Sequence, residues 1–317
     1  MSRKRAEQMA TSKRSGKNTV SSVLRRDYQL LILCLPGLLY LAVFEYAPIW
    51  GVQIAFKDFT FGSTIWNARW VGAENFIRFV TYPYFWRLMS NTLMIAVVLL
   101  LIPFPITIIF ALVTNATRLK RFKRFYQTVV YAPHFISAVV LVGIITVFTS
   151  PRTGIINILL ARFGIAPIFF LGTPGWFLPI LTSSHVWQQC GWASILYLAT
   201  LTSVPPELYE SAMIDGASRW QRVKFIDIPA IVPTMVIILI LRLGQLLSLN
   251  WQTILLMQNN LNIRTSEVVQ TFVYKTGILR GDFSYAAAAG LFVAVINLIL
   301  IVGANSAARA LRQQALW

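Results

Sequence analysis

Charged side chains are scarce in this sequence. They make up 12% of its 317 residues, while 56% are hydrophobic, and soluble domains carry roughly 25% charged residues. A soluble protein of this composition could not cover its surface with polar groups, so that class is excluded. A membrane span needs about 20 apolar residues. The chain has room for several such spans, and we expect a polytopic membrane protein.

Cysteine and histidine are nearly absent, with two of each. Cys34 and Cys190 both fall in apolar runs, where they act as small apolar residues and predict neither a disulfide framework nor a metal cluster. His134 and His185 have no nearby carboxylates with which to build a zinc site. We therefore expect no metal ion.

The sequence also lacks a nucleotide-binding motif. No segment matches G-x-x-x-x-G-K-[ST], since Gly16-Lys17-Asn18 has neither the earlier glycine nor the hydroxyl residue. Polar residues are not clustered as a catalytic site inside the membrane would need. We expect that the chain is not an enzyme and that it binds no cofactor of its own.

Lysine and arginine are abundant by comparison, since 28 of them against 11 acidic residues give a formal net charge of +17. Nearly all flank apolar runs, which is the pattern of cytoplasmic loops rather than of a nucleic-acid-binding protein. The pattern predicts a basic cytoplasmic tail over residues 1–27 that touches lipid headgroups. It also places the other end, a short tail over 308–317, in the cytoplasm.

Apolar runs that could cross a membrane occur six times along the chain. The predicted fold class is all-α integral membrane, with one six-helix transmembrane domain over residues 28–307. The expected spans are about 28–50, 85–113, 126–149, 176–203, 230–255 and 284–307.

One cytoplasmic stretch, from Glu207 to Pro233, is more elaborate than an ordinary loop between spans. It follows Pro205 and Pro206, which cannot continue the preceding helix, and it gives way to the next apolar run at Pro229 and Pro233. Asp215-Gly216 is a turn signal between two short helical patterns. The order of features is acidic helix, turn, basic and aromatic helix, then proline.

The spacing in this stretch resembles the cytoplasmic signature of binding-protein-dependent ABC importer permeases. That signature is Glu-Ala-Ala, a glycine six residues after the glutamate, and Ile-x-Leu-Pro beginning sixteen after it. Two positions depart from it, since Ser211 replaces the first alanine and Ile228 replaces the leucine. Asp215-Gly216-Ala217-Ser218 is common in the sugar-importing branch. The matching residues are Glu210, Ala212, Gly216, Ile226 and Pro229.

This resemblance implies a type I ABC importer permease fold, with a core over about 85–305 and a coupling loop, 207–229, between helices 4 and 5. The implied function is the transmembrane subunit of an ATP-driven importer that translocates a carbohydrate. Pro133-His134-Phe135-Ile136-Ser137 is similar to the branch for oligosaccharides and polysaccharide fragments, including alginate-type importers. The location implied is the bacterial inner membrane.

The same resemblance implies partners. These are a second, homologous permease subunit in a heterodimer, a dimer of ABC ATPases that use ATP and magnesium, and an extracytoplasmic solute-binding protein that delivers an oligosaccharide. Met213, Trp220 and Phe225 could anchor the loop in a groove of the ATPase. The residues expected to couple the two subunits are Glu210, Ser211, Ala212, Asp215, Gly216, Ala217, Ser218, Phe225 and Pro229.

Two polar helix faces are candidates for the translocation path, because polar groups inside a span need a cavity or a partner helix. In the fourth span His185, Gln188, Gln189 and Trp192 follow the spacing of one helix face. In the fifth span Arg242, Gln245, Leu249 and Gln252 share another. Aromatic rings beside amides suit sugar rings, but hydrogen bonding between helices explains both faces equally well. The charge of Arg242 could meet either of two partners. One is an acidic sugar, and the other is an acidic residue of the partner subunit in a structural ion pair.

Two other function classes require features that this sequence lacks. A stand-alone secondary transporter or channel would need carboxylates deep in its spans to bind the coupling ion, and the predicted spans contain none there. A membrane enzyme would need a polar catalytic cluster. Co-purification of an ATPase would separate an importer permease from both.

Overall fold

A computed structural model of the chain describes residues 28–60, 62–117, 119–248 and 250–310, and they are mostly helical. The predicted tail over 1–27 and the last seven residues lie outside the described residues. The chain divides after Gln53 into two compact units, which are described separately. In the first unit α3 (Tyr28–Tyr40) continues through the π-helical turn η1 (Leu41–Tyr46) into the 3-10 helix η2 (Ala47–Phe56), whose last three residues belong to the second unit.

The second unit contains the remaining elements, including a small antiparallel sheet in which Lys57 pairs with Trp70. In chain order the elements are β1 (Lys57–Asp58), β2 (Arg69–Trp70), α4 (Glu74–Val80), α5 (Phe85–Leu101), α6 (Pro103–Ala116), α7 (Lys120–Tyr131), η3 (Ala132–Phe135), α8 (Ala138–Phe148), α9 (Ile155–Arg162), α10 (Pro174–Thr202), α11 (Pro206–Ile214), α12 (Arg219–Arg222), η4 (Val223–Asp227), α13 (Ile228–Gly244), α14 (Trp251–Met257), α15 (Ile263–Ser266), α16 (Val269–Tyr274), η5 (Lys275–Leu279) and α17 (Phe283–Ala310).

Several helices are long and apolar enough to cross a membrane, as the sequence predicts. Leu31–Phe56, Phe85–Ala116, Arg219–Gly244 and Phe283–Ala310 qualify by length and composition, and a bent pair, Lys120–Phe135 with Ala138–Phe148, would make a fifth. The 29-residue α10 is not among them. It is long enough, at about 43 Å for 1.5 Å per residue, but polar residues interrupt it. The count of six spans remains a prediction.

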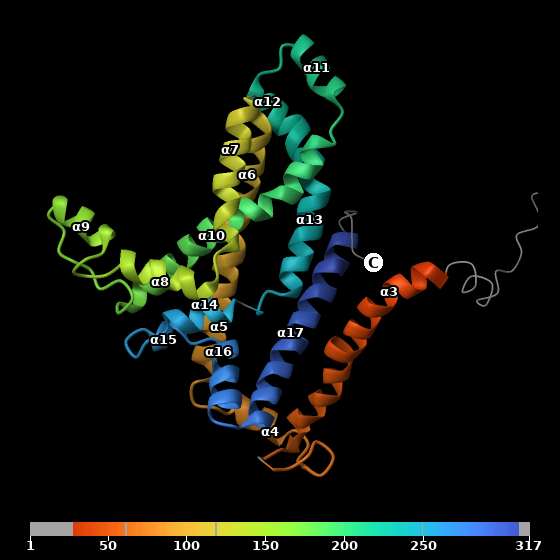
Figure 1. Cartoon of the computed structure of the whole chain (residues 1–317), viewed down its shortest axis with the longest axis vertical. Coiled ribbons are helices and arrows are strands. Elements are labelled where there is room, and N and C mark those ends of the chain that lie inside the picture. Colours follow the sequence, from red (N-terminus) through yellow and green to blue (C-terminus); the bar gives the residue numbers. More distant parts are fainter. Residues whose placement is uncertain (1–27, 61, 118, 249, 311–317) are drawn as a thin grey trace, which may run out of the picture. The chain divides into compact units, whose positions relative to one another are not determined.

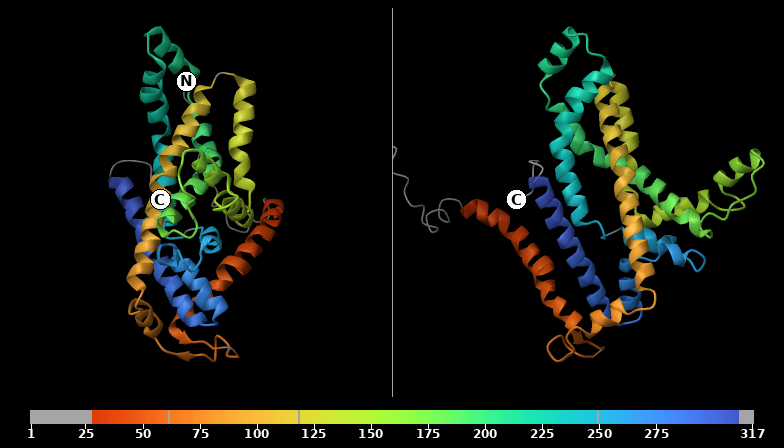
Figure 2. Two further views of the ribbon diagram at one scale, coloured as in Figure 1. Left: turned by 90° about the vertical axis from the view of Figure 1, so that its left-hand side faces the viewer. Right: turned by 180° about the vertical axis from the view of Figure 1, so that it is seen from behind.

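The third predicted span, 126–149, is not one straight helix. Its two halves meet at an angle of 102°, because Pro133 has no N–H to continue the helix and Ser137 begins a new one by accepting a hydrogen bond from Val140 N at 3.4 Å. As a result α8 and α9 extend away from the group formed by α6, α7 and α13 (Figure 2).

The fifth predicted span, 230–255, is also wrong in its extent, because α13 ends at Gly244 and α14 is a separate helix. Side chains from α16 and α17 form hydrogen bonds to the N–H and C=O groups of the segment between α13 and α14. Asn297 Oδ1 accepts from Leu247 N at 3.1 Å, and Asn297 Nδ2 donates to Ser248 Oγ at 3.0 Å. Gln270 Nε2 donates to Leu247 O. A non-helical segment at membrane depth is stable when protein groups replace the missing backbone bonds.

Replacing Asn297 with leucine should therefore destabilise the protein. Both hydrogen bonds to the break would be lost and Leu247 N would be left unsatisfied, at a cost of about 1–3 kcal/mol. Thermal unfolding of the detergent-purified protein would measure the loss as a lower Tm. Ile299→Ala, on the exposed side of α17, is the matched control and should change Tm little.

The core of the second unit is aromatic and lies where α4, α5, α16 and α17 meet. Phe79 is fully buried, and its ring packs edge-on against Phe85 at 5.2 Å and Phe292 at 5.6 Å between centroids. A second close contact joins α10 to α7. A Cβ at Gly191 would lie 2.2 Å from Val130 O, so only glycine allows this approach. The rigid packing holds α10, which carries most of the predicted path.

Candidate functional site

Residues 206–227, which we call the elbow, have the predicted form of two short helices joined by a turn. Gly216 adopts φ +77°, a conformation that favours glycine. The turn is closed by Gly216 N donating to Met213 O at 3.1 Å and Ala217 N donating to Ala212 O at 2.8 Å. These bonds satisfy the last carbonyls of α11, so the reversal of the chain at Asp215-Gly216 is fixed.

The second arm of the elbow is joined to a membrane helix without a break. Ser218 Oγ accepts from Gln221 N at 3.3 Å while Gln221 Oε1 accepts from Ser218 N at 2.7 Å, and together they form a capping box at the N-terminus of α12. Pro229 does not end the helix. It cannot donate to the carbonyl of Phe225, and the chain adjusts by a π turn in which Ile228 N donates to Val223 O. Arg219–Gly244 is consequently one helical rod.

The elbow exposes large apolar side chains. Trp220 is 71% exposed, Phe225 66% and Met213 48%, and Leu208 and Ile214 are exposed beside them. The sequence predicts the first three as anchors, and the structure adds Leu208 and Ile214 to the same exposed surface. Basic side chains border them, with Lys224 Nζ 5.3 Å from the centre of the Phe225 ring. An apolar surface with a charged rim is typical of a protein-docking site.

The predicted coupling residues lie within the elbow and at its junction with α13. α11 and α12 are at the end of the second unit where α6 ends and α7 begins, and α4 is at the opposite end (Figure 1). Glu210, Ser211, Asp215 and Gly216 are exposed, while Ala212 and Ala217 are half-buried. Ser218 and Phe225 are exposed as well, and Pro229 lies in the first turn of α13.

Three of the four predicted path residues on α10 lie beside η3. His134 stacks on Trp192 with parallel rings 4.6 Å apart, and its Nδ1 lies 2.9 Å from Gln189 Oε1. Gln188 Nε2 donates to Ile136 O at 2.7 Å. Phe135, 74% exposed, packs edge-on against Trp192. His134 and Phe135 were not predicted as path residues, because their partners are more than 50 positions away.

His185 faces a different neighbour. It lines a small cavity together with Gln188, Asn250 and Thr253, so the predicted face of α10 is shared between η3 and α14. The hydroxyl Oγ1 of Thr253 is buried there without a hydrogen-bond partner among the described residues. Asn250 and Thr253 therefore join His185 as polar groups at the break between α13 and α14.

The predicted face that Arg242 and Gln245 share with Gln252 is not formed, because α13 ends at Gly244 and α14 begins at Trp251. The fourth predicted member, Leu249, lies outside the described residues. Arg242 is half-buried in the last turn of α13, which packs against α10. Gln245 is exposed at the helix end. Among the described residues no carboxylate pairs with Arg242, so its charge is available to a ligand or a partner chain.

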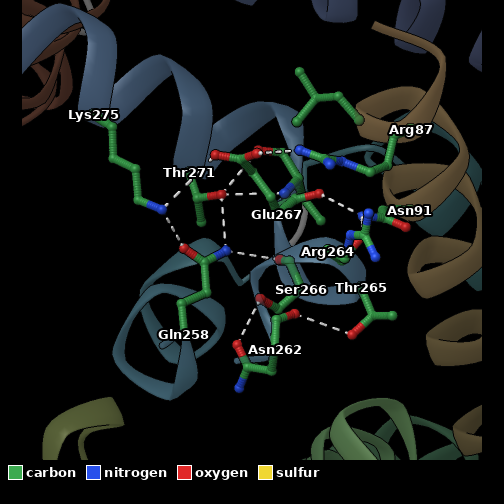
Figure 3. Close-up of polar contacts among 12 residues, drawn as sticks. Arg87, Asn91, Gln258, Asn262, Arg264, Thr265, Ser266, Glu267, Thr271 and Lys275 are labelled. Atoms are coloured by element: carbon green, nitrogen blue, oxygen red, sulfur yellow. Dashed lines mark hydrogen bonds and ion pairs between the residues drawn. The ribbon is translucent and has the colours of Figure 1, made fainter. Parts of the chain in front are cut away.

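A third polar group, which we call the Glu267 cluster, joins α5 to the segment before α17 (Figure 3). Glu267 pairs with Arg87 at 3.6 Å and with Lys275 at 3.9 Å. Burial lowers the pKa of Lys275, and Glu267 opposes that shift. Lys275 Nζ also donates to Gln258 Oε1 at 2.7 Å. Asn91 Nδ2 donates to Arg264 O and Glu267 O. The cluster holds α15 and α16 against α5, and sequence spacing alone gave no sign of it.

Long apolar helices, polar groups along α10 and an exposed elbow that continues a membrane helix define a transport protein of the membrane. The chain belongs to the family of binding-protein-dependent transport system inner membrane components, whose characteristic sequence covers residues 104–313. It is accordingly the permease of such a system and a multi-pass protein of the inner membrane.

Two relatives from Bacillus subtilis (strain 168) are similar over nearly their whole length. Protein LplB is 43% identical, with 93% of each chain covered. The polygalacturonan/rhamnogalacturonan transport system permease protein YteP is 38% identical, covering 96% of this chain and 95% of that protein.

Two solved structures have the same fold. One is a bacterial ABC transporter that imports the acidic polysaccharide alginate, with TM-score 0.84 and 37% identity over 90% of this chain and 97% of that one. The other is a bacterial alginate ABC transporter in complex with an alginate pentasaccharide-bound periplasmic protein. Its TM-score is 0.86, with 36% identity over 94% of this chain and 99% of that one.

Proposed function

We propose that this chain is the transmembrane permease subunit of an ATP-driven importer for an oligosaccharide that carries carboxylate groups. The observation that carries the proposal is the elbow, an exposed apolar surface on two short helices that runs directly into a membrane helix. Such a surface suits the docking of a separate motor protein. The acidic substrate class is supported by Arg242, which has no carboxylate partner in the described part of the chain, and by relatives that handle polygalacturonan or alginate.

The proposed arrangement has six spans, counting α10 and the bent pair. Both chain ends and the elbow are cytoplasmic, with a permease core over about 85–305 and a coupling loop over 207–229. The partners are a second, homologous permease, two ABC ATPase subunits and an extracytoplasmic solute-binding protein. ATP and magnesium are used by the ATPase pair, and this chain carries out no hydrolysis itself.

The mechanism follows from the unbroken helix. When the ATPase pair closes on ATP, it displaces the elbow, and the rod Arg219–Gly244 moves with it because no flexible joint lies between. α13 packs against α10 and α17, so these helices shift as near-rigid bodies and alternately open the path to each side of the membrane. Transport is coupled to ATP hydrolysis because the elbow and the helix Arg219–Gly244 move together.

The sugar path in this proposal runs past Trp192, Phe135 and the amide of Gln189, while the buried Gln188 holds η3 in place through its hydrogen bond to Ile136 O. Aromatic rings pack against the C–H faces of sugar rings, and amides hydrogen-bond to their hydroxyl groups. His185, Gln245 and Arg242 lie at the break between α13 and α14, where a carboxylate of the sugar would meet the guanidinium of Arg242.

Trp192→Ala should lower the transport rate about 3- to 10-fold, since loss of an aromatic contact removes roughly 0.5–1.5 kcal/mol beyond its area. Uptake of labelled oligosaccharide into proteoliposomes measures it. Trp187→Ala removes another exposed tryptophan of α10 and should leave uptake close to wild type. Equal losses in both variants would contradict the placement of the path.

The proposed function is tested by purifying the assembly through a tag on this chain and reconstituting it with its binding protein. An ATPase should co-purify, and acidic oligosaccharides should stimulate hydrolysis of ATP more than neutral ones. If no ATPase co-purifies and uptake is driven by an ion gradient instead, the chain is a secondary transporter and the proposal fails.

A further inference from the structure

The first helix of the elbow, α11, makes few contacts with the rest of the second unit. None of its nine residues is buried, and it packs over no extended surface against another helix. Turns flank it at both ends. A helix with so few contacts would move independently of its neighbours. If it receives a force from a partner, something must transmit that force to the membrane helices.

One side chain of α11 makes a strong contact with the body of the protein. Tyr209 is half-buried, and its hydroxyl donates a hydrogen bond of 2.5 Å to Asp227 Oδ1. Asp227 belongs to η4, within the rod Arg219–Gly244. The same carboxylate oxygen lies 3.5 Å from Asn115 Nδ2 in the last turn of α6. One carboxylate thus connects three elements that sequence places far apart.

The buried surroundings of Asp227 strengthen its hydrogen bonds to Tyr209 and Asn115. Asp227 is 5% exposed and lines a cavity of about 280 Å³ beside Arg219 and Arg222. A buried carboxylate is unfavourable unless it is hydrogen-bonded or near positive charge, and short bonds to an ionised acceptor are roughly twice as strong as neutral ones. Burial, together with the bond to Asp227, raises the pKa of Tyr209 to about 12. The hydroxyl therefore stays protonated and able to donate.

We propose that Asp227 is a positioning residue that fastens α11, through Tyr209, to the rod Arg219–Gly244 and to the end of α6. When α11 is displaced, the hydrogen bonds of Asp227 move both membrane helices with it. Without these bonds α11 would move alone and the membrane helices would stay in place. The proposal rests on the proposed coupling function of the elbow. It adds that coupling depends on an internal bond as well as on the docking surface.

The experiment compares wild type, Tyr209→Phe, Asp227→Asn and the double variant in the assembled complex. Hydrogen exchange of the backbone amides of 206–214, measured by mass spectrometry, should be about tenfold faster in each single variant. The double variant should be no faster than the singles, because all three lack the same bond. Tyr131→Phe, which removes a hydroxyl from α7 that accepts from Gln127, is the control and should exchange as wild type.

Transport measurements then separate positioning from plain stability. The variants should keep basal ATP hydrolysis and the KM for ATP, while sugar moved per ATP hydrolysed falls about tenfold. Unchanged exchange over 206–214 in Tyr209→Phe and Asp227→Asn would overturn the fastening. Faster exchange with undiminished coupling would overturn its role. Failure of the wild-type complex to couple ATP to uptake would instead show that the proposed function is wrong, and this inference with it.

Discussion

Replacing Gly216 with proline should abolish coupled transport while the chain still inserts into the membrane. Proline fixes φ at about −65°, whereas Gly216 has φ +77°. The substitution also removes the N–H that bonds to Met213 O. Strain and the lost bond together amount to roughly 3 kcal/mol or more, enough to lower the population of the native turn at least about 100-fold. Stimulation of ATP hydrolysis by the loaded binding protein measures the effect.

Gly216→Asn is the matched control, because asparagine tolerates positive φ better than other side chains. It should retain most of the stimulated activity. Membrane insertion of both variants is checked by their yield in membranes and by their elution as a single species. Normal uptake by the proline variant would show that the shape of the turn does not matter for coupling.

Replacing Arg242 with glutamine should remove transport of acidic oligosaccharides and spare neutral ones. A charge-assisted hydrogen bond contributes about 1.5–3 kcal/mol, so uptake of a substrate that carries carboxylates should fall about 10- to 100-fold. The residue lies at the end of α13 with no carboxylate partner among the described residues, so the substitution should leave α13 intact. Uptake of matched acidic and neutral sugars into proteoliposomes gives the ratio.

Arg242→Lys is the companion variant. It keeps the positive charge but loses the planar pair of donors, so it should recover part of the acidic-sugar uptake. An equal loss for acidic and neutral sugars in Arg242→Gln would assign the residue to contacts between subunits instead of substrate recognition. That outcome would remove the main structural support for an acidic substrate.

The parts of the fold that sequence reasoning predicted have local signals. The turn at Asp215-Gly216 needs a residue that accepts positive φ, and a glycine follows an aspartate there. Long apolar runs gave the membrane class. The polar spacing of Gln188, Gln189 and Trp192 on α10 gave three side chains that the structure brings together with η3.

The features that sequence reasoning missed depend on residues far apart in the chain. The helix break after Gly244 is stabilised by Asn297 and Gln270, which no local pattern connects to it. Stacking of His134 on Trp192 joins positions 58 residues apart. Such contacts are decided by packing, and the period of hydrophobic residues along one helix contains no information about them.

The central claim is that the elbow receives the movement of a motor protein from the cytoplasmic side. It is tested most directly by placing a photoreactive amino acid at the position of Trp220, which is 71% exposed, and illuminating the assembled complex. The account predicts one cross-linked product that contains this chain and the ATPase, formed with higher yield when ATP is bound. A cross-link to the extracytoplasmic binding protein, or chemical labelling of the elbow from outside intact cells, would contradict it.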